Sequence, residues 1–276
     1  MEKSLKTILQ TYGFNFKKAY GQNFLTDTTL LSEIVKNAGV TKDDVVLEIG
    51  CGAGALTKVL SKNAKKVVGY EIDQKLKPVL RDVLSDCDNV EIVFNDVLKE
   101  KMSELESKLN DDYMVVANLP YYITTPIIMN FLEKGSRVKS MSIMVQKEVA
   151  ERLTAKAGDS EYGAITVGIN LRGSAKIIAD VPREMFTPMP NVDSAVVKID
   201  IEKNKFSDVD FKKVRDVVRI AFSSRRKMLV NNLMNGYKLP RAKAEEILNM
   251  ANVSLTVRGE DLTASDYVRL SKVINV

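Results

Sequence analysis

Short apolar runs alternate with longer amphipathic stretches between Asp44 and Gln146. The short runs are rich in Val and Ile, which is typical of buried strands, and the stretches between them have helical spacing. The pattern predicts strands at 45–50, 67–73, 90–94, 113–118 and 140–146, and helices at 55–63, 74–84, 126–135 and 146–156. Strands that alternate with helices in this way indicate an α/β fold, with a mostly parallel sheet covered on both faces.

The pattern changes after the fifth predicted strand. AITVGINLR (164–172) alternates like a strand, and this pattern alone leaves its structure ambiguous. Residues 175–182 and 193–201 are predicted as two further strands, joined by a Pro-rich loop, and they are expected to form a hairpin at the end of the sheet. The polar segment 202–208 precedes a helical, basic region. We therefore predict one domain over 1–202 and a small α-helical domain over 203–276.

Composition excludes several classes of chemistry. The chain has 276 residues, two cysteines (Cys51 and Cys87) and no histidine. Two cysteines are too few for a disulfide framework or a structural zinc site, and without histidine there is no Ser-His or Cys-His catalysis. No apolar run reaches the ~18 residues that cross a bilayer, and the N-terminus does not resemble a signal peptide. We expect a cytoplasmic protein with no membrane segment and no metal.

The net charge of +5 is modest, but the basic residues are unevenly distributed. Between Phe206 and Lys238 there are eight Lys or Arg residues against three Asp. The first 18 residues add Lys3, Lys6, Lys17 and Lys18 against Glu2. Two basic regions are compatible with one phosphate-binding surface, and equally with solvated helix faces, so charge alone leaves both open.

A glycine-rich turn follows the first predicted strand. VVLEIGCGAGALT places Gly50, Gly52 and Gly54 between a strand and a helix, where backbone can approach a ligand closely. The spacing is G-x-G-x-G, whereas the dinucleotide fingerprint is G-x-G-x-x-G and seats a pyrophosphate. With the acidic Glu48 before it, the turn suits S-adenosylmethionine, a ligand without phosphates.

Two acidic residues follow the next strands. Glu71 is placed to accept hydrogen bonds from ribose hydroxyls, and Asp96 from an adenine amine. Taken alone, each is better explained as a surface or capping residue. Together, at successive strand ends, they predict a crevice for an adenosyl group.

The tetrapeptide Asn118-Leu119-Pro120-Tyr121 follows the fourth predicted strand. An exocyclic amine of a base is a poor nucleophile, and it reacts when two acceptors hold its N–H groups. The Asn118 side-chain oxygen and the Pro120 carbonyl are candidates for those acceptors, and Tyr121 for stacking on the base. Phe186, in a Pro-rich loop, is a second stacking candidate or an ordinary core residue. The alternative for the tetrapeptide is a simple turn.

Taken together, these motifs resemble those of the bacterial small-subunit (16S) ribosomal RNA adenine N6-dimethyltransferases, the kasugamycin-resistance methyltransferase family. The resemblance covers essentially the whole chain. It rests on six ordered segments: GQNFL (21–25), VLEIGCGAGALT (46–57), NLPYYITTPII (118–128), FTPMPNVDSAVVKI (186–199), AFSSRRKMLVNNL (221–233) and VRGEDLTASDYVRL (257–270).

The resemblance implies a Rossmann-like class I methyltransferase sheet and a helical RNA-binding domain, in a protein expected to be a monomer. It implies a helix at 164–172. The implied activity is dimethylation of two adjacent adenines in the 3′-terminal hairpin of 16S rRNA, on a late assembly intermediate of the small subunit. The implied cofactor pocket consists of Asn23, Leu25, Gly50, Glu71, Asp96 and Asn118. Arg225, Arg226 and Lys227 are the candidate RNA-binding residues.

Three alternatives remain. The related large-subunit rRNA adenine methyltransferases share the core chemistry, but the two C-terminal segments argue against them. A non-enzymatic RNA-binding assembly factor with a methyltransferase fold is disfavoured by the intact Asn-Leu-Pro-Tyr and glycine-rich motifs. A nicotinamide dehydrogenase is disfavoured by the glycine spacing.

Overall fold

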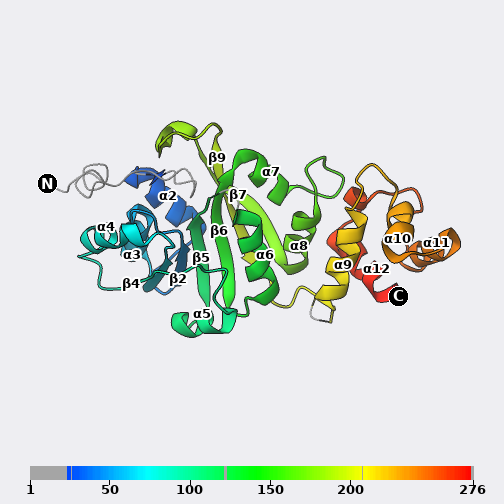
Figure 1. Ribbon diagram of the computed structural model, residues 1–276, viewed down its shortest axis with the longest axis horizontal. Coiled ribbons are helices and arrows are strands. Elements are labelled where there is room, and N and C mark those ends of the chain that lie inside the picture. The colour runs from blue at the N-terminus through cyan, green and yellow to red at the C-terminus, as the bar shows by residue number, and fades with distance from the viewer. Residues whose placement is uncertain (1–23, 26, 121–122, 207, 275–276) are drawn as a thin grey trace. The chain divides into compact units, whose positions relative to one another are not determined.

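The structure is a computed structural model that describes residues 24–25, 27–120, 123–206 and 208–274 (Figure 1). The chain divides into two compact units: residues 1–150 with 176–201, and residues 151–175 with 202–276. The prediction assigned 151–175 to the first domain, whereas these residues group with the C-terminal helices. The reason is apolar packing, because Tyr162 and Leu171 belong to the same buried cluster as Val214.

The first unit is built on a seven-stranded sheet in the order β4-β3-β2-β5-β6-β9-β7. The strands from β4 to β6 are parallel, and β9 runs antiparallel to β6. A separate two-stranded sheet pairs β1 with β8. The strands are β1 (Phe24–Leu25), β2 (Val45–Ile49), β3 (Lys66–Tyr70), β4 (Val90–Val93), β5 (Tyr113–Asn118), β6 (Val138–Gln146), β7 (Gly173–Val181), β8 (Phe186–Thr187) and β9 (Ser194–Ile201).

The five predicted parallel strands are confirmed, and β7 and β9 are neighbours at the end of the sheet as predicted. Their sequences show why: β2 and β5 are buried along almost their whole length, and their residues are apolar apart from Glu48 in β2 and Asn118 at the end of β5. The strand order also places β5 beside β2, with β3 on the other side of β2. From β2 the chain continues to one side of the sheet through β3 and β4, and later to the other side through β5 and β6. The carboxyl ends of β2 and β5 lie at this topological switch point, where doubly wound sheets bind ligands.

Helices cover both faces of this sheet (Figure 1). On one face, Val35 of α2 and Leu60 of α3 share a buried cluster with Val46 and Val116 of the sheet. On the other face, α6 is held by an edge-on ring contact between Phe131 and Tyr113, with centroids 6.4 Å apart. The helices that begin in this unit are α2 (Thr28–Ala38), α3 (Ala55–Asn63), α4 (Lys77–Val83), α5 (Met102–Leu109), α6 (Thr124–Lys134) and α7 (Lys147–Thr154), with short 3₁₀ turns at Gln74–Leu76 and Arg183–Met185.

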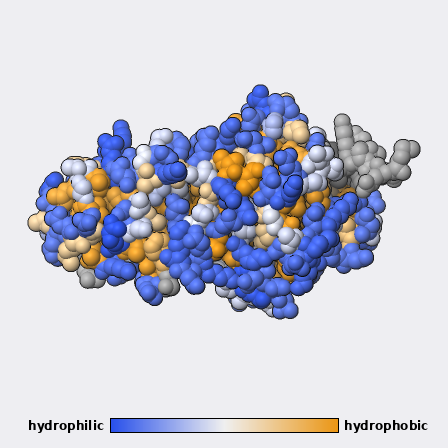
Figure 2. Space-filling model, turned by 180° about the vertical axis from the view of Figure 1, so that it is seen from behind, coloured by the Kyte–Doolittle hydropathy of each residue, from blue (hydrophilic) through white to orange (hydrophobic). Residues whose placement is uncertain are grey.

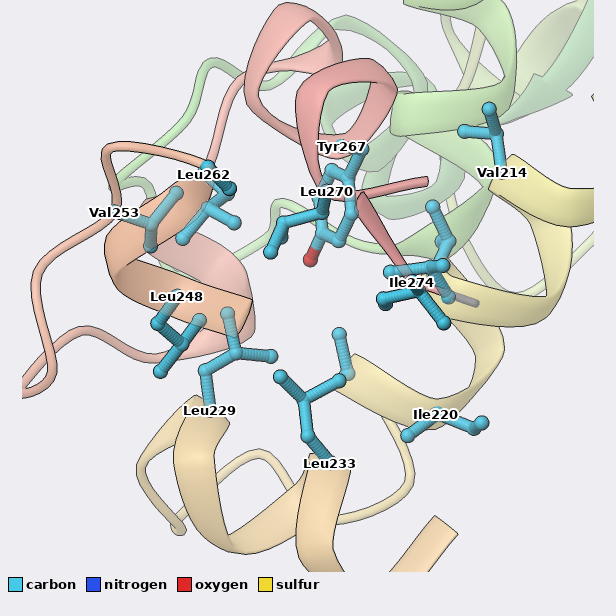
Figure 3. Packing of buried hydrophobic residues seen from close by; sticks show 14 of the residues in the cluster. Val214, Ile220, Leu229, Leu233, Leu248, Val253, Leu262, Tyr267, Leu270 and Ile274 are labelled. Atoms are coloured by element: carbon cyan, nitrogen blue, oxygen red, sulfur yellow. The ribbon is translucent and has the colours of Figure 1, made fainter. Parts of the chain in front are cut away.

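The second unit is helical. Its core is one apolar cluster, in which Leu229, Leu233 and Leu270 point toward a common centre (Figure 3). Residues 164–172 form α8, so the helix implied by the resemblance is confirmed over the strand-like alternation. The helices are α8 (Ala164–Arg172), α9 (Phe211–Ala221), α10 (Leu229–Tyr237), α11 (Arg241–Met250) and α12 (Ala264–Val273), with a 3₁₀ turn at Gly259–Asp261.

No helix in the described part of the chain is long and apolar enough to span a membrane. Hydrophilic residues cover most of the face shown in Figure 2, and the hydrophobic areas on it are separate from one another.

Candidate active site

The glycine-rich turn joins β2 to α3 and has an unusual backbone. Gly50, Gly52 and Gly54 have φ values of +79°, +54° and +86°, a region that residues with a Cβ rarely adopt. At Gly52 there is also no space, because a Cβ would lie 2.8 Å from Cε1 of Phe24. The turn therefore requires glycine both for its conformation and for its close contact with β1.

Glu71, directly after β3, fixes this turn to the sheet. Its Oε2 accepts a hydrogen bond from the Gly52 N–H at 2.8 Å, and its Oε1 accepts one from the Asp73 N–H at 2.8 Å. The side chain is buried, and burial raises the pKa of Glu71, while the backbone N–H donors oppose that rise. Each carboxylate oxygen uses one lone pair on the backbone and keeps another for a ligand.

A cavity of about 270 Å³ opens between the carboxyl ends of the strands. This is near the lower end of the ~300–1,000 Å³ typical of ligand pockets. Its lining brings together these residues singled out from the sequence: Leu25, Glu48, Gly50, Gly52, Glu71, Asp96, Asn118, Pro120 and Phe186. Asn23 and Tyr121 lie outside the described residues. Segments separated by more than 160 residues in the chain thus contribute to one site.

Near β3 and β4, the cavity is lined by apolar side chains and by the carboxylates of Glu71 and Asp96. Asp96 Oδ1 accepts a hydrogen bond from the Leu98 N–H at 3.0 Å, which holds its carboxylate at the end of β4. Ile72 and Leu98 line the cavity and remain 51% and 38% exposed, which is high for large apolar side chains. Neither residue was predicted from the sequence. The available signal was an apolar residue one position after Glu71 and another two positions after Asp96.

The Asn-Leu-Pro segment begins at the last residue of β5. Asn118 pairs with Met144 of β6, and a Cβ on Gly50 would lie only 3.5 Å from the Asn118 carbonyl oxygen. The glycine-rich turn and the tetrapeptide are therefore in direct proximity. The Pro120 carbonyl accepts a hydrogen bond from the Ile123 N–H at 3.1 Å. That contact fixes the direction of the carbonyl and leaves its second lone pair available.

Phe186 combines the two roles that the sequence left open. It pairs with Leu25 across the small β1–β8 sheet and is only 4% exposed. It belongs to a buried apolar cluster, and it also lines the cavity. A ring anchored in this way forms a rigid wall against which a planar ligand can stack.

In the second unit, the three candidate RNA-binding residues differ in their surroundings. The Arg225 guanidinium donates to the carbonyl oxygens of Ser160 and Tyr162, at 2.6 and 3.0 Å, and lies 3.6 Å from a carboxylate oxygen of Glu260. It therefore holds the turn before α8 in place. Arg226 and Lys227 are exposed beside it. No sequence motif indicates this structural role for Arg225.

Sequence comparison identifies relatives along the whole chain. A sequence model described as "Ribosomal RNA adenine dimethylase" matches residues 13–275. "Ribosomal RNA small subunit methyltransferase A" of Bacillus pumilus is 45% identical over 276 residues, covering 98% of this chain and 94% of the relative. The protein of the same name from Clostridioides difficile is 43% identical, with the same two coverages.

Two solved structures are similar in fold. A dimethyladenosine transferase from Plasmodium falciparum superposes with a TM-score of 0.76 and 28% identity, over 90% of this chain and 95% of that one. The 23S rRNA methyltransferase ErmE gives a TM-score of 0.69 and 26% identity, over 91% and 99% of the two chains.

Proposed function

The chain belongs to the ribosomal RNA adenine dimethylase family, and we propose that it transfers methyl groups from S-adenosylmethionine to N6 of two adjacent adenines near the 3′ end of 16S rRNA. One observation carries the proposal. Asn118, at the end of β5, lies beside the glycine-rich turn that follows β2, in a cavity that also holds Glu71 and Asp96. An amine-binding residue thus adjoins a site suited to an adenosyl group.

The cavity fits this cofactor in three respects. Glu71 keeps a lone pair on each oxygen, which matches the two ribose hydroxyls. Ile72 and Leu98 offer apolar surface to an adenine ring, and Asp96 offers an acceptor for its amine. Glu48 provides a carboxyl group on the cavity lining, suited to a cationic end of the ligand. When bound, S-adenosylmethionine supplies an electrophilic methyl group.

The chain's own residues prepare the adenine. The Asn118 side-chain oxygen and the free lone pair of the Pro120 carbonyl accept the two N–H bonds of the amine. Held in this way, the nitrogen directs its lone pair toward the methyl group. The Phe186 ring forms one wall for the base, which must leave its stack to enter. Tyr121 is proposed for the other wall, from the sequence.

Each transfer forms one bond from N6 to carbon, breaks one bond from sulfur to carbon, and releases one N6 proton to solvent. No base has to remove the proton beforehand, because the methyl group is already activated. That is consistent with a chain that contains no histidine. The rate enhancement then comes from positioning and from oriented acceptors.

The choice of the small subunit follows from the relatives. Those named for the small subunit are 43–45% identical over about 94% of their length, whereas the large-subunit enzyme is 26% identical. As part of the proposal, the protein acts as a monomer on an assembly intermediate. Residues 203–276, with Arg226 and Lys227 exposed, then serve as its RNA-binding region.

The test is to incubate the protein with radiolabelled S-adenosylmethionine and small subunits that lack these methyl groups. We expect label at two adjacent adenines in the 3′-terminal hairpin, up to two methyl groups on each. Label on large subunits instead would support the alternative function. Cofactor binding without transfer to either subunit would contradict the enzymatic proposal.

A further inference from the structure

Glu48 has an environment that none of the roles above requires. It lies within β2, is 1% exposed, and lines the cavity. Neither carboxylate oxygen has a hydrogen-bond partner at normal geometry among the described residues. An ionised carboxylate is unfavourable in such a place, because burial removes its hydration and no hydrogen bond or ion pair replaces it.

The elements packed around Glu48 offer little to an ionised carboxylate. Its partners across the sheet are Gly69 on β3 and Val116 on β5, neither of which carries a charge. The Thr57 hydroxyl of α3 and the Cys51 thiol lower the pKa of Glu48 and so favour its ionised form, but burial has the larger, opposite effect. The titratable groups that act on Glu48 are Cys51 and Glu71.

On balance the surroundings favour the neutral acid. Burial, the largest cause, and the negative charge of Glu71 together raise the pKa of Glu48 to about 7, against the smaller opposite effect of Thr57 and Cys51. Burial also raises the pKa of the Cys51 thiol well above its usual value, so the thiol stays neutral. Within the described residues, no basic side chain contributes to the pKa of Glu48.

Glu71 shows the opposite arrangement in the same cavity. Two backbone N–H groups donate to its oxygens, and such donors favour the charged form. When two carboxyl groups share a cavity, the better-solvated one keeps the charge and the other keeps the proton. The geometry therefore distinguishes an ionised Glu71 from a protonated Glu48.

We propose that Glu48 carries a proton in the cofactor-free site and releases it to solvent when the positively charged end of S-adenosylmethionine enters. This inference rests on the proposed function. A positive group within ~4–6 Å favours the ionised carboxylate and supplies the partner that Glu48 lacks. Cofactor binding is thereby linked to the release of a proton, and affinity rises with pH.

The size of the effect follows from the pKa of about 7. At pH 6 most of the cofactor-free protein carries the proton, which must leave before binding, whereas at pH 8 little does. The affinity for S-adenosylmethionine should therefore be about tenfold weaker at pH 6 than at pH 8. In Glu48→Gln, which has no proton to lose, this pH dependence should largely disappear.

The decisive experiment is titration calorimetry with S-adenosylmethionine at pH 6.5, in several buffers of different ionisation enthalpy. The slope of the observed enthalpy against the buffer enthalpy gives the number of protons released. We expect about 0.8 proton for the wild type, from a pKa of about 7. We expect a value smaller by that amount for Glu48→Gln. Any proton exchanged by the cofactor's own amine appears in both proteins and cancels.

The outcomes separate this inference from the proposed function. Wild-type protein that binds the cofactor without releasing a proton, or equal release by wild type and Glu48→Gln, overturns the role of Glu48 alone. Absence of any binding overturns the proposed function and this inference with it. If Glu48→Gln does not fold, the pH dependence of wild-type affinity is the test, and absence of the tenfold loss between pH 8 and pH 6 overturns the inference. Glu91→Gln, a substitution at an exposed residue of β4, is the control.

Discussion

Glu71→Gln tests whether the carboxylate that holds the glycine-rich turn also binds the cofactor. The substitution preserves shape and one carbonyl oxygen, and replaces the other oxygen by an NH₂ group, which only donates. Either the Gly52 N–H or the Asp73 N–H, each now bonded at 2.8 Å, then faces another donor. One of the two acceptors proposed for the ribose hydroxyls is lost at the same time.

The expected loss of affinity is larger than the expected loss of stability. A hydrogen bond to a charged acceptor contributes about 1.5–3 kcal/mol, which corresponds to a roughly 10- to 150-fold higher Kd. An unsatisfied backbone donor costs ~1–3 kcal/mol of folding free energy, or about 2–10 °C in Tm. The neutral amide also removes the cost of burying the Glu71 charge, which raises the pKa of this carboxyl. We therefore expect a change of Tm in the lower part of that range.

Calorimetry with S-adenosylmethionine at pH 8 measures the affinity, because Glu48 is then mostly ionised before the cofactor binds. Thermal unfolding without cofactor measures stability. Glu91→Gln is the matched control, since its side chain is 51% exposed and forms a surface ion pair with Lys66. A folded Glu71→Gln protein with wild-type affinity would refute the assignment of Glu71 to the ribose.

Four further variants test the rest of the site and the second unit. Asn118→Ala should lower kcat about 10²–10³-fold with little loss of RNA affinity, by analogy with the deletion of an oxyanion-hole donor. Single-turnover rates at saturating cofactor and RNA measure this, and a near-normal rate would contradict the mechanism. Charge reversal at Arg226 and Lys227 should weaken binding to the immature subunit and flatten its salt dependence, and an unchanged slope would mean a solvated face. Arg225→Ala should instead lower Tm, because its guanidinium holds the turn before α8, and equal Tm values would contradict that role. Gly52→Ala should weaken cofactor binding through a backbone at φ +54°, measured by calorimetry against Gly158→Ala, at a glycine with positive φ and open space.

The sheet was predictable because its strands are buried on both faces. Apart from Glu48 in β2 and Asn118 at the end of β5, these strands therefore read as Val-rich apolar runs, and their bounds differ from the prediction by one residue at most. For α8 the pattern favoured the wrong structure. Thr166, Val167, Ile169 and Leu171 are all buried, so apolar residues occur around the helix and the 3.6-residue period is lost.

Other elements carried signals that the analysis did not use. α2 begins after Asp27, whose carboxylate caps the N–H groups of Thr29 and Leu30, and it ends at Gly39 with φ +79°. An acidic N-cap and a glycine C-cap mark a helix in sequence. The sequence therefore carries a signal for each end of α2.

The composition of the site was predictable, but the partners of its residues were not. A strand-ending acid or a basic run identifies a residue type at a position. Glu71 lines the cavity and Arg226 is exposed, and their roles in binding stay predictions. The Arg225 guanidinium donates to backbone carbonyls, and this contact depends on the position of a turn 63–65 residues away in the chain. The lack of a hydrogen-bond partner at Glu48 likewise depends on every element packed around it, so a local sequence pattern does not predict it.

The coupling between the two carboxyl groups gives Glu71→Gln a second consequence. Burial raises the pKa of Glu48 to about 7, and the negative charge of Glu71 contributes to that rise. A neutral residue at 71 removes this contribution, so Glu48 should lose its proton at lower pH. The Kd of Glu71→Gln for S-adenosylmethionine, measured from pH 5.5 to 8.5, should therefore level off at lower pH than that of the wild type. The position of this bend does not depend on the absolute affinity, which Glu71→Gln also changes. A bend at the wild-type pH would mean that Glu71 does not act on Glu48, and that burial alone keeps the proton in place.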